Sequence, residues 1–122
     1  MLDKIDEYKF YYPYKSSRKQ KKFMVLINDG GHIKWVHFGD TKYEHYTEGH
    51  LDEQRRINYD KRNINRDKER DNYNSAAFWA YWYLWKYPTY KEAYEHIKLK
   101  ILKKYLKYFY FIYFHYFLIY TK

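Results

Sequence analysis

Several residue types that define whole classes of protein are absent or scarce in this 122-residue chain. Cysteine is absent, which excludes a disulfide framework, a thiolate zinc site and a cysteine nucleophile. Glycine and proline number only four and two, and no glycine-rich phosphate loop, Walker motif or nucleophile elbow occurs. The sequence shows no secretory signal pattern. We therefore expect a small domain of a reducing compartment that is not secreted.

Aliphatic residues are also scarce, and aromatic residues replace them. Leu, Ile, Val and Phe make up about a fifth of the chain, close to the composition at which chains stop folding alone. Aromatic residues make up 25%, including 19 tyrosines, and each buried ring removes a large apolar area from water. The length allows one domain. Lys and Arg number 24 against 15 Asp and Glu, and the resulting charge of +9 favours anionic partners.

A β-hairpin is predicted over residues 22–39. An apolar run at 23–27 precedes Asn-Asp-Gly-Gly and a second strand-like run at 32–38. Asp-Gly and Gly-Gly supply the positive φ angles of tight hairpin turns. Two registers are open, because a loop of Asp29-Gly30 pairs Leu26 with Ile33 and a loop of Gly30-Gly31 pairs Leu26 with Trp35. A two-stranded hairpin is marginal alone, so helices are expected to cover one face.

Residues 40–74 are charge-dense and are interpreted as a polar helix and loop. The helix is expected to start at Leu51, and Leu51, Ile57 and Tyr59 are its core candidates. An aromatic helix is predicted over 75–87, with Ser75 as its N-cap. Its apolar residues occur on all sides, so it is expected at the centre of the domain.

An amphipathic helix is predicted over 89–107, where Thr89 and Glu92 form a capping box. The aromatic run that follows, 108–122, has three interpretations: a continuation of the helix into a partner or a membrane surface, an added strand, or a degenerate tail. Its uncharged part is too short for a transmembrane helix, which needs about 20 residues. Residues 1–21 are a basic and aromatic N-terminal arm, in which the run at 15–22 is interpreted as a solvated linker rather than a nucleic-acid patch.

The expected fold is therefore one α+β domain over 22–107, with the hairpin packed against two or three helices and an aromatic-rich core. The expected core residues are Phe23, Val25, Ile27, Trp35, Val36, Phe38, Phe78, Trp82, Trp85, Tyr94, Ile97 and Ile101.

No catalytic or metal-binding pattern emerges from the chemically active residues. The spacing of the six histidines matches no known metal site, and a metal needs three or four convergent ligands. Acid pairs such as Asp52-Glu53 are expected by chance in a chain with 15 carboxylates. We therefore expect no metal, no cofactor, no small-molecule substrate and no catalytic residue.

Basic residues interleaved with rings make nucleic acid the more serious ligand. Arginines cluster at 55–70, although acids at 52–71 nearly cancel their charge, so a salt-bridged solvated face is the simpler interpretation there. The residues expected to contact nucleic acid or a partner are Arg55, Arg56, Arg62, Arg66, Lys98, Lys103 and Lys104.

Residues 22–102 resemble a small domain family of unknown function from nucleocytoplasmic large DNA viruses and their environmental relatives. The resemblance lies in the ordered pattern Val-His-Phe-Gly, Tyr…Tyr-Thr…His-x-Asp, Arg-Arg…Tyr…Arg, and Phe-Trp-x-x-Trp-x-Leu-Trp-x-x-Pro-Thr. The matching residues are Val36, His37, Phe38, Gly39, Tyr43, Tyr46, Thr47, His50, Asp52, Arg55, Arg56, Tyr59, Arg62, Phe78, Trp79, Trp82, Leu84, Trp85, Pro88 and Thr89.

The chain departs from this pattern at two places. Arg62-Asn63 stands where the family has Arg-His, and Ala80-Tyr81 stands where it has Ser-Arg. Any ligand contact made by that His and Arg would be lost in this chain. The resemblance implies a viral origin and carries no activity.

Three functions are weighed. The leading one is a non-enzymatic structural or interaction component of a virion that contacts capsid or other virion proteins, packaged DNA or, through its tail, a membrane surface. The second is a sequence-independent nucleic-acid-binding protein in the cytoplasm or nucleus of the infected cell. The third is an enzyme acting on nucleic acid, which requires His37, His50 and Asp52 to converge.

Overall fold

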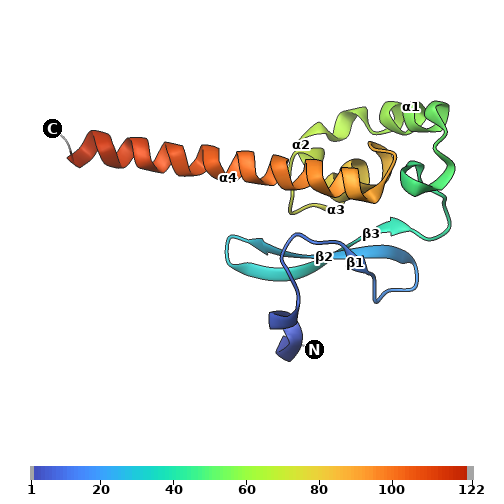
Figure 1. The fold of residues 1–122 in the computed structure, drawn as a ribbon, viewed down its shortest axis with the longest axis horizontal. Helices are drawn as coiled ribbons and strands as arrows, with labels where there is room; N and C mark the ends of the chain where they lie inside the picture. Colours follow the sequence, from blue (N-terminus) through green and yellow to red (C-terminus); the bar gives the residue numbers. More distant parts are fainter. Residues whose placement is uncertain (1, 121–122) are drawn as a thin grey trace.

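A computed structural model of the chain describes residues 2–120, without the side chains of residues 2–4 and 67. The fold is α+β, as predicted, with an antiparallel sheet on one side and a layer of helices on the other (Figure 1). Three strands form the sheet in the order β1 (Tyr14–Lys15), β2 (Lys21–Asp29) and β3 (His32–Asp40). The chain begins with a 3-10 helix, η1 (Leu2–Glu7), and the sheet lies between it and the helical layer.

The predicted hairpin is confirmed as β2 and β3, joined by Gly30 and Gly31. Leu26 pairs with Trp35, which is the second of the two registers. Both glycines have positive φ angles, and the Oδ1 of Asn28 accepts a hydrogen bond from the Gly31 amide at 2.8 Å. The third strand, β1, was not predicted. It pairs with residues 23–24, so the basic run interpreted as a linker connects two strands and begins the second.

Different parts of the chain cover the two faces of the sheet. Val25, Ile27 and Phe38 are buried under the helices. Trp35 was predicted in this core, but it packs against Tyr8 of the N-terminal arm, with ring centroids 5.0 Å apart. The prediction was wrong because alternate residues of a strand point to opposite faces, and Trp35 and Phe38 are three residues apart.

The first long helix is α1 (Glu53–Arg62), which follows a wide turn, η2 (Tyr46–His50). The helix begins two residues later than predicted, because Leu51 has a left-handed backbone (φ 50°). Its side chain is 51% exposed, so Leu51 is wrong as a core candidate, whereas Ile57 and Tyr59 are half-buried. A short 3-10 helix η3 (Ile64–Arg66) and a single helical turn α2 (Asp67–Arg70) complete the polar segment.

The aromatic segment forms a short helix, α3 (Ala76–Trp79), which continues as a wider π-type helix, η4 (Ala80–Trp85). Ser75 caps α3 as predicted, since its Oγ accepts a hydrogen bond from the Phe78 amide at 3.1 Å. Trp82, predicted in the core, is only half-buried. The i→i+5 bonding of a π-helix shifts later side chains around the axis relative to α-helical spacing.

The last helix, α4 (Tyr90–Tyr120), is 31 residues long, or about 46 Å. Thr89 caps it as predicted, because its Oγ1 accepts a hydrogen bond from the Glu92 amide at 3.2 Å. The helix does not end at residue 107, so the aromatic run continues it and is not a strand; residues 121–122 lie outside the described residues. Within residues 2–120, no helix combines the length and apolar character needed to cross a membrane.

The main core lies between the sheet and residues 78–101. Phe23, Val36, Trp82, Tyr94 and Ile101 of the predicted core are partly buried at its edge. Its fully packed members are Val25, Ile27, Phe38, Phe78, Trp79, Tyr83, Leu84, Trp85, Ala93 and Ile97.

Candidate functional site

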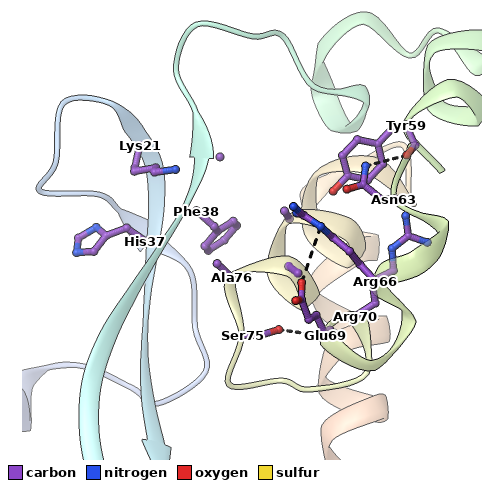
Figure 2. A pocket seen from close by; sticks show the side chains of 13 residues that line it. Lys21, His37, Phe38, Tyr59, Asn63, Arg66, Glu69, Arg70, Ser75 and Ala76 are labelled. Atoms are coloured by element: carbon purple, nitrogen blue, oxygen red, sulfur yellow. Dashed lines mark hydrogen bonds and ion pairs between the residues drawn. The ribbon is translucent and has the colours of Figure 1, made fainter. Parts of the chain in front are cut away.

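Two adjoining cavities lie on either side of the C-terminal end of α1. The first, which we call the α1 cavity, has a volume of about 680 Å³ and is lined by Tyr43, Glu44, His45, Arg55, Asn58, Tyr59, Arg62, Asn63 and Trp85. The second, which we call the sheet cavity, has a volume of about 360 Å³ and lies between β3 and the helices (Figure 2). Tyr59 and Asn63 line both, so the two cavities meet at these residues.

The position of α1 is fixed at its first turn by hydrogen bonds. The Oδ1 of Asp52 accepts hydrogen bonds from the amides of Gln54 and Arg55, at 3.0 and 3.2 Å. The Nδ1 of His50 in turn accepts one from the Asp52 amide at 2.9 Å. This N-cap directs Arg55, Asn58 and Arg62 along one face of the helix, because residues spaced three, four and seven apart share a face.

Trp85 joins α1 to the preceding loop. Its ring lies parallel to that of Tyr59, with centroids 4.4 Å apart and an interplanar angle of 5°. The rings of His45 and His50 contact Trp85 at 5.7 and 5.4 Å. All three partners in these contacts that belong to the sequence motif, Tyr59, His50 and Trp85, therefore meet in space. Tyr59 and Trp85 line the α1 cavity, and His50 supports the ring of Trp85.

His45 is held neutral beside a lysine. The Nζ of Lys22 lies 2.7 Å from the Nδ1 of His45 and donates a hydrogen bond to the Tyr43 carbonyl at 2.7 Å. Burial of His45, together with the nearby Lys22 charge, lowers its pKa to about 4. Nδ1 therefore accepts from the ammonium, and Nε2 carries the ring proton.

The other motif residues have structural roles. Gly39 has φ +82°, and a Cβ there would lie 3.0 Å from Cδ1 of Leu84, so both the conformation and the space favour glycine. The Nε1 groups of Trp79 and Trp82 donate hydrogen bonds to the carbonyls of Tyr73 and Arg70, each at 2.9 Å. The carbonyl of Pro88 accepts a hydrogen bond from the Glu48 amide.

The three residues of the enzyme hypothesis are not brought together. His50 and Asp52 are hydrogen-bonded neighbours, but Figure 2 shows that His37 points to the side of β3 opposite to Phe38 and the helices. There the Nδ1 of His37 lies 2.7 Å from the Oγ of Ser16. Among the interactions of residues 2–120, none joins His37 to the other two.

The predicted arginines divide into two groups. Arg56 pairs with Glu53 and lies 3.7 Å from Asp60, and Arg66 lies 4.0 Å from Glu69. In contrast, Arg55 and Arg62 have no carboxylate partner within the described part of the chain, and both line the α1 cavity. The salt-bridged face expected from the sequence therefore describes Arg56 and Arg66 but not these two.

Arg70 was counted in the arginine cluster but not predicted as a site residue. Its guanidinium is mostly buried, lies 3.6 Å from Asp60 and stacks over Tyr81 at 4.1 Å from the ring centroid. It lines the sheet cavity opposite Lys21 (Figure 2).

The three predicted lysines of α4 differ in the same way. Lys104 reaches the body, where its Nζ lies 3.0 Å from the Oδ1 of Asp71. Lys98 lies over the ring of Tyr94, 4.9 Å from the centroid, and Lys103 is exposed. Lys98 and Lys103 have no ion pair with a described carboxylate, so their charges face solvent.

Sequence reasoning missed Lys22, His45 and Asn58 as site residues. Helical spacing from Arg55 could have identified Asn58. No sequence signal could have joined Lys22 to His45, because they lie 23 residues apart on a strand and a loop. No cluster of three His, Asp or Glu side chains that could hold a metal ion occurs among the residues whose side chains are described.

Residues 14–63 match the model of a family of unknown function, DUF5754. The match covers β1 to the end of α1, which includes most of the α1 cavity but not Trp85. Comparisons with the curated proteins and with the solved structures found no match.

Proposed function

We propose that the protein is a non-enzymatic interaction component that attaches to an anionic membrane surface through residues 108–120, and that it belongs to the virion of a large DNA virus. The viral setting is supported by the resemblance of the motif residues. The attachment is supported by one observation, which is that an aromatic helix projects from the folded body (Figure 1). We call residues 108–120 the aromatic helix end.

The aromatic helix end exposes a large apolar side chain at every position except His115. Its Phe, Tyr, Leu and Ile side chains are between 45% and 73% exposed. Ring contacts such as Phe111 with His115 and Tyr116 with Tyr120 lie within the helix itself. Monomeric soluble proteins rarely expose so extended an apolar surface, and such surfaces mark sites of interaction with proteins or membranes.

The distribution of the rings favours lipid over a single partner helix. Consecutive residues are exposed, so apolar side chains point to all sides of the axis. A paired helix would cover one stripe and leave the other side chains in water, whereas lipid surrounds an inserted helix end. The end is about 20 Å long, and tyrosine is a residue of the membrane interface.

The charge at the start of the aromatic helix end favours an anionic surface. Lys98, Lys103 and Lys107 are exposed on the preceding turns and form no ion pair with a described carboxylate. The helix end itself carries no Asp, Glu, Lys or Arg. Basic residues next to an apolar segment provide the second signal that stable membrane attachment needs.

Flotation of the full chain with lipid vesicles tests this attachment. We expect binding to phosphatidylcholine vesicles with 30% phosphatidylserine and at least tenfold weaker binding to phosphatidylcholine alone. Lys103→Gln with Lys107→Gln should weaken binding by about thirtyfold, because each charge near such a surface contributes about 1 kcal/mol to the binding free energy. The matched control is Lys61→Gln with Lys68→Gln, which removes the same charge from the exposed side of the helical layer.

Replacement of Phe111 and Phe114 by serine removes apolar area without changing charge and should also reduce flotation, with the far-ultraviolet spectrum of the body retained. Equal binding to neutral and anionic vesicles would refute the charge argument. A stable oligomer, held by 108–120 and unchanged by vesicles, would assign the surface to a second copy instead. Quantitative mass spectrometry of purified particles tests the viral setting, and absence from the particles would refute it.

A further inference from the structure

The α1 cavity and the sheet cavity adjoin each other at the C-terminal end of α1, and we call the two together the groove. Tyr59 and Asn63 line both cavities, and Figure 2 shows these two residues beside the sheet cavity. The α1 cavity alone falls within the range of volumes that hold small ligands. A groove of two joined cavities suits an extended ligand with a repeated unit better than one compact molecule.

Cationic side chains face this groove from both cavities. In the α1 cavity, Arg55 and Arg62 lie two helical turns apart, about 10 Å along the axis. Arg55 makes one long hydrogen bond, 3.5 Å, to the Glu44 carbonyl, and neither arginine is neutralised by a carboxylate that the structure describes. Guanidinium groups match the geometry of phosphate oxygens. In the sheet cavity Lys21 adds a further cation, whereas Arg66 there lies 4.0 Å from the carboxylate of Glu69.

The α1 cavity also has a free aromatic ring at its rim. Tyr43 is 62% exposed, while its carbonyl is held by Lys22. The other rings that line the cavity are already stacked on one another, as with Tyr59 and Trp85. Tyr43 has no ring contact with any described residue, so its face is available to a planar group.

Amide groups complete the polar lining. The Oδ1 of Asn58 accepts a hydrogen bond from Gln54, which leaves the Asn58 amino group directed to no described acceptor. The Nδ2 of Asn63 donates to the Tyr59 carbonyl, which leaves its Oδ1 as an acceptor. Amide donors and acceptors of this kind hydrogen-bond to the phosphate oxygens and sugars of nucleic acids, contacts that do not distinguish one base from another.

We propose that this groove binds a single strand of nucleic acid, with Arg55 and Arg62 on successive phosphates and the ring of Tyr43 stacked on a base. A nucleotide combines a phosphate with a planar base, and the repeated phosphates of a strand match the two arginines better than the single unit of a free nucleotide does. Binding is independent of sequence, because stacking and phosphate contacts distinguish bases weakly.

Fluorescence anisotropy of a labelled twelve-nucleotide thymidine strand with the full chain tests this groove. The variant Arg55→Gln with Arg62→Gln should bind about 25-fold more weakly at 0.1 M salt, because two lost phosphate contacts reduce the slope of log K against log salt by about 1.4. The matched control Lys61→Gln with Lys68→Gln has the same net charge, keeps every lysine of α4 and should change affinity less than twofold. An equal reduction of the salt slope in the control would show that binding depends on the net charge of the protein and not on the groove, and it would overturn the proposal.

Variants of Tyr43 separate stacking from charge. Tyr43→Ser should weaken binding about tenfold with the salt slope unchanged, and Tyr43→Phe should restore it. Circular dichroism of each variant establishes that the body is folded, and the carbonyl bond to Lys22 does not depend on the side chain. Equal loss in both variants would overturn the stacking role.

Competitors distinguish the source of the nucleotide. An unlabelled strand should displace the labelled one at micromolar concentration, and adenosine monophosphate should require at least a hundredfold more. Displacement by the mononucleotide at the same concentration would assign the site to a free nucleotide, and equal affinity for a duplex would place binding outside the groove. Either result overturns the proposal, and neither bears on membrane attachment through the aromatic helix end.

Discussion

Acid should destabilise the protein through His45. Its ring is 7% exposed, and burial together with the Lys22 charge lowers its pKa in the folded chain to about 4, against 6.5 when it is solvated. The unfolded chain therefore takes up a proton between pH 6.5 and about 4 that the folded chain does not. Stability is complete above pH 6.5 and is lost as the pH falls through this window.

The size of this loss follows from the same two values. The difference between 6.5 and about 4 corresponds to about 3 kcal/mol, at about 1.4 kcal/mol for each pH unit. This is a large part of the 5–15 kcal/mol typical of a domain, so it is measurable. Carboxylates titrate mostly at lower pH, which separates their effect from that of the histidine.

Urea unfolding followed by tryptophan fluorescence, at pH values from 7 to 4.5, measures the effect. His45→Gln removes the titrating group and keeps an oxygen that can accept from Lys22. The free-energy advantage of the wild type over this variant should shrink by about 2.5 kcal/mol between pH 7 and pH 4.5, since the lower end of this range lies above the pKa of the folded chain. His32→Gln, at the exposed tip of the hairpin, serves as the control and should retain the wild-type pH dependence. If His45→Gln and the wild type lose stability in parallel, His45 is not the buried neutral base described above.

Three further substitutions test local features of the fold by their change in unfolding free energy. Gly39→Ala should cost about 1–3 kcal/mol, because the backbone there is left-handed and the new Cβ would contact Leu84. Gly31→Ala should cost less, because Gly31 also has a positive φ but lies in open space. Equal costs would show that the contact with Leu84 adds nothing. Asp52→Ala should cost about 1 kcal/mol, because two amides of α1 lose their acceptor, and an unchanged urea midpoint would show that water replaces it. Leu84→Ala should cost about 2–5 kcal/mol and Leu51→Ala less than about 1, since only Leu84 is fully buried; a reversed order would restore Leu51 to the core.

Local features of this fold could be predicted because their causes lie within a few residues. Gly30 and Gly31 supply the positive φ angles of the turn, and Ser75 and Thr89 accept hydrogen bonds from amides three residues later. These interactions form between near neighbours in the chain, so the sequence pattern and the structure agree.

The core was predicted less well because side-chain direction depends on register. The alternatives left Leu26 opposite either Ile33 or Trp35, and only packing against both faces of the sheet selects the second. Once it is selected, Trp35 belongs to the N-terminal arm. The π-type helix at 80–85 likewise changes which side chains of the aromatic segment are exposed. No residue type marks this wider turn in the sequence, so the change could not be predicted.

The groove depends most on long-range contacts. Helical spacing places Arg55 and Arg62 on one face, but their lack of a partner depends on which acids fold near them. Asp60, for example, meets Arg70, which lies ten residues later in the chain, and helical spacing does not predict this contact.

By itself, the sequence determined the hairpin, the caps of the helices, the aromatic character of the core and the excess of positive charge. These features follow from composition and from contacts between residues that are close in the chain, within one hairpin turn or one turn of a helix. Only the tertiary structure decided the register, the third strand, the groove between α1 and the sheet, and the projection of the aromatic helix end. Each of these requires segments far apart in the chain to compete for the same surface, and burial of apolar area across the whole domain decides which of them is covered.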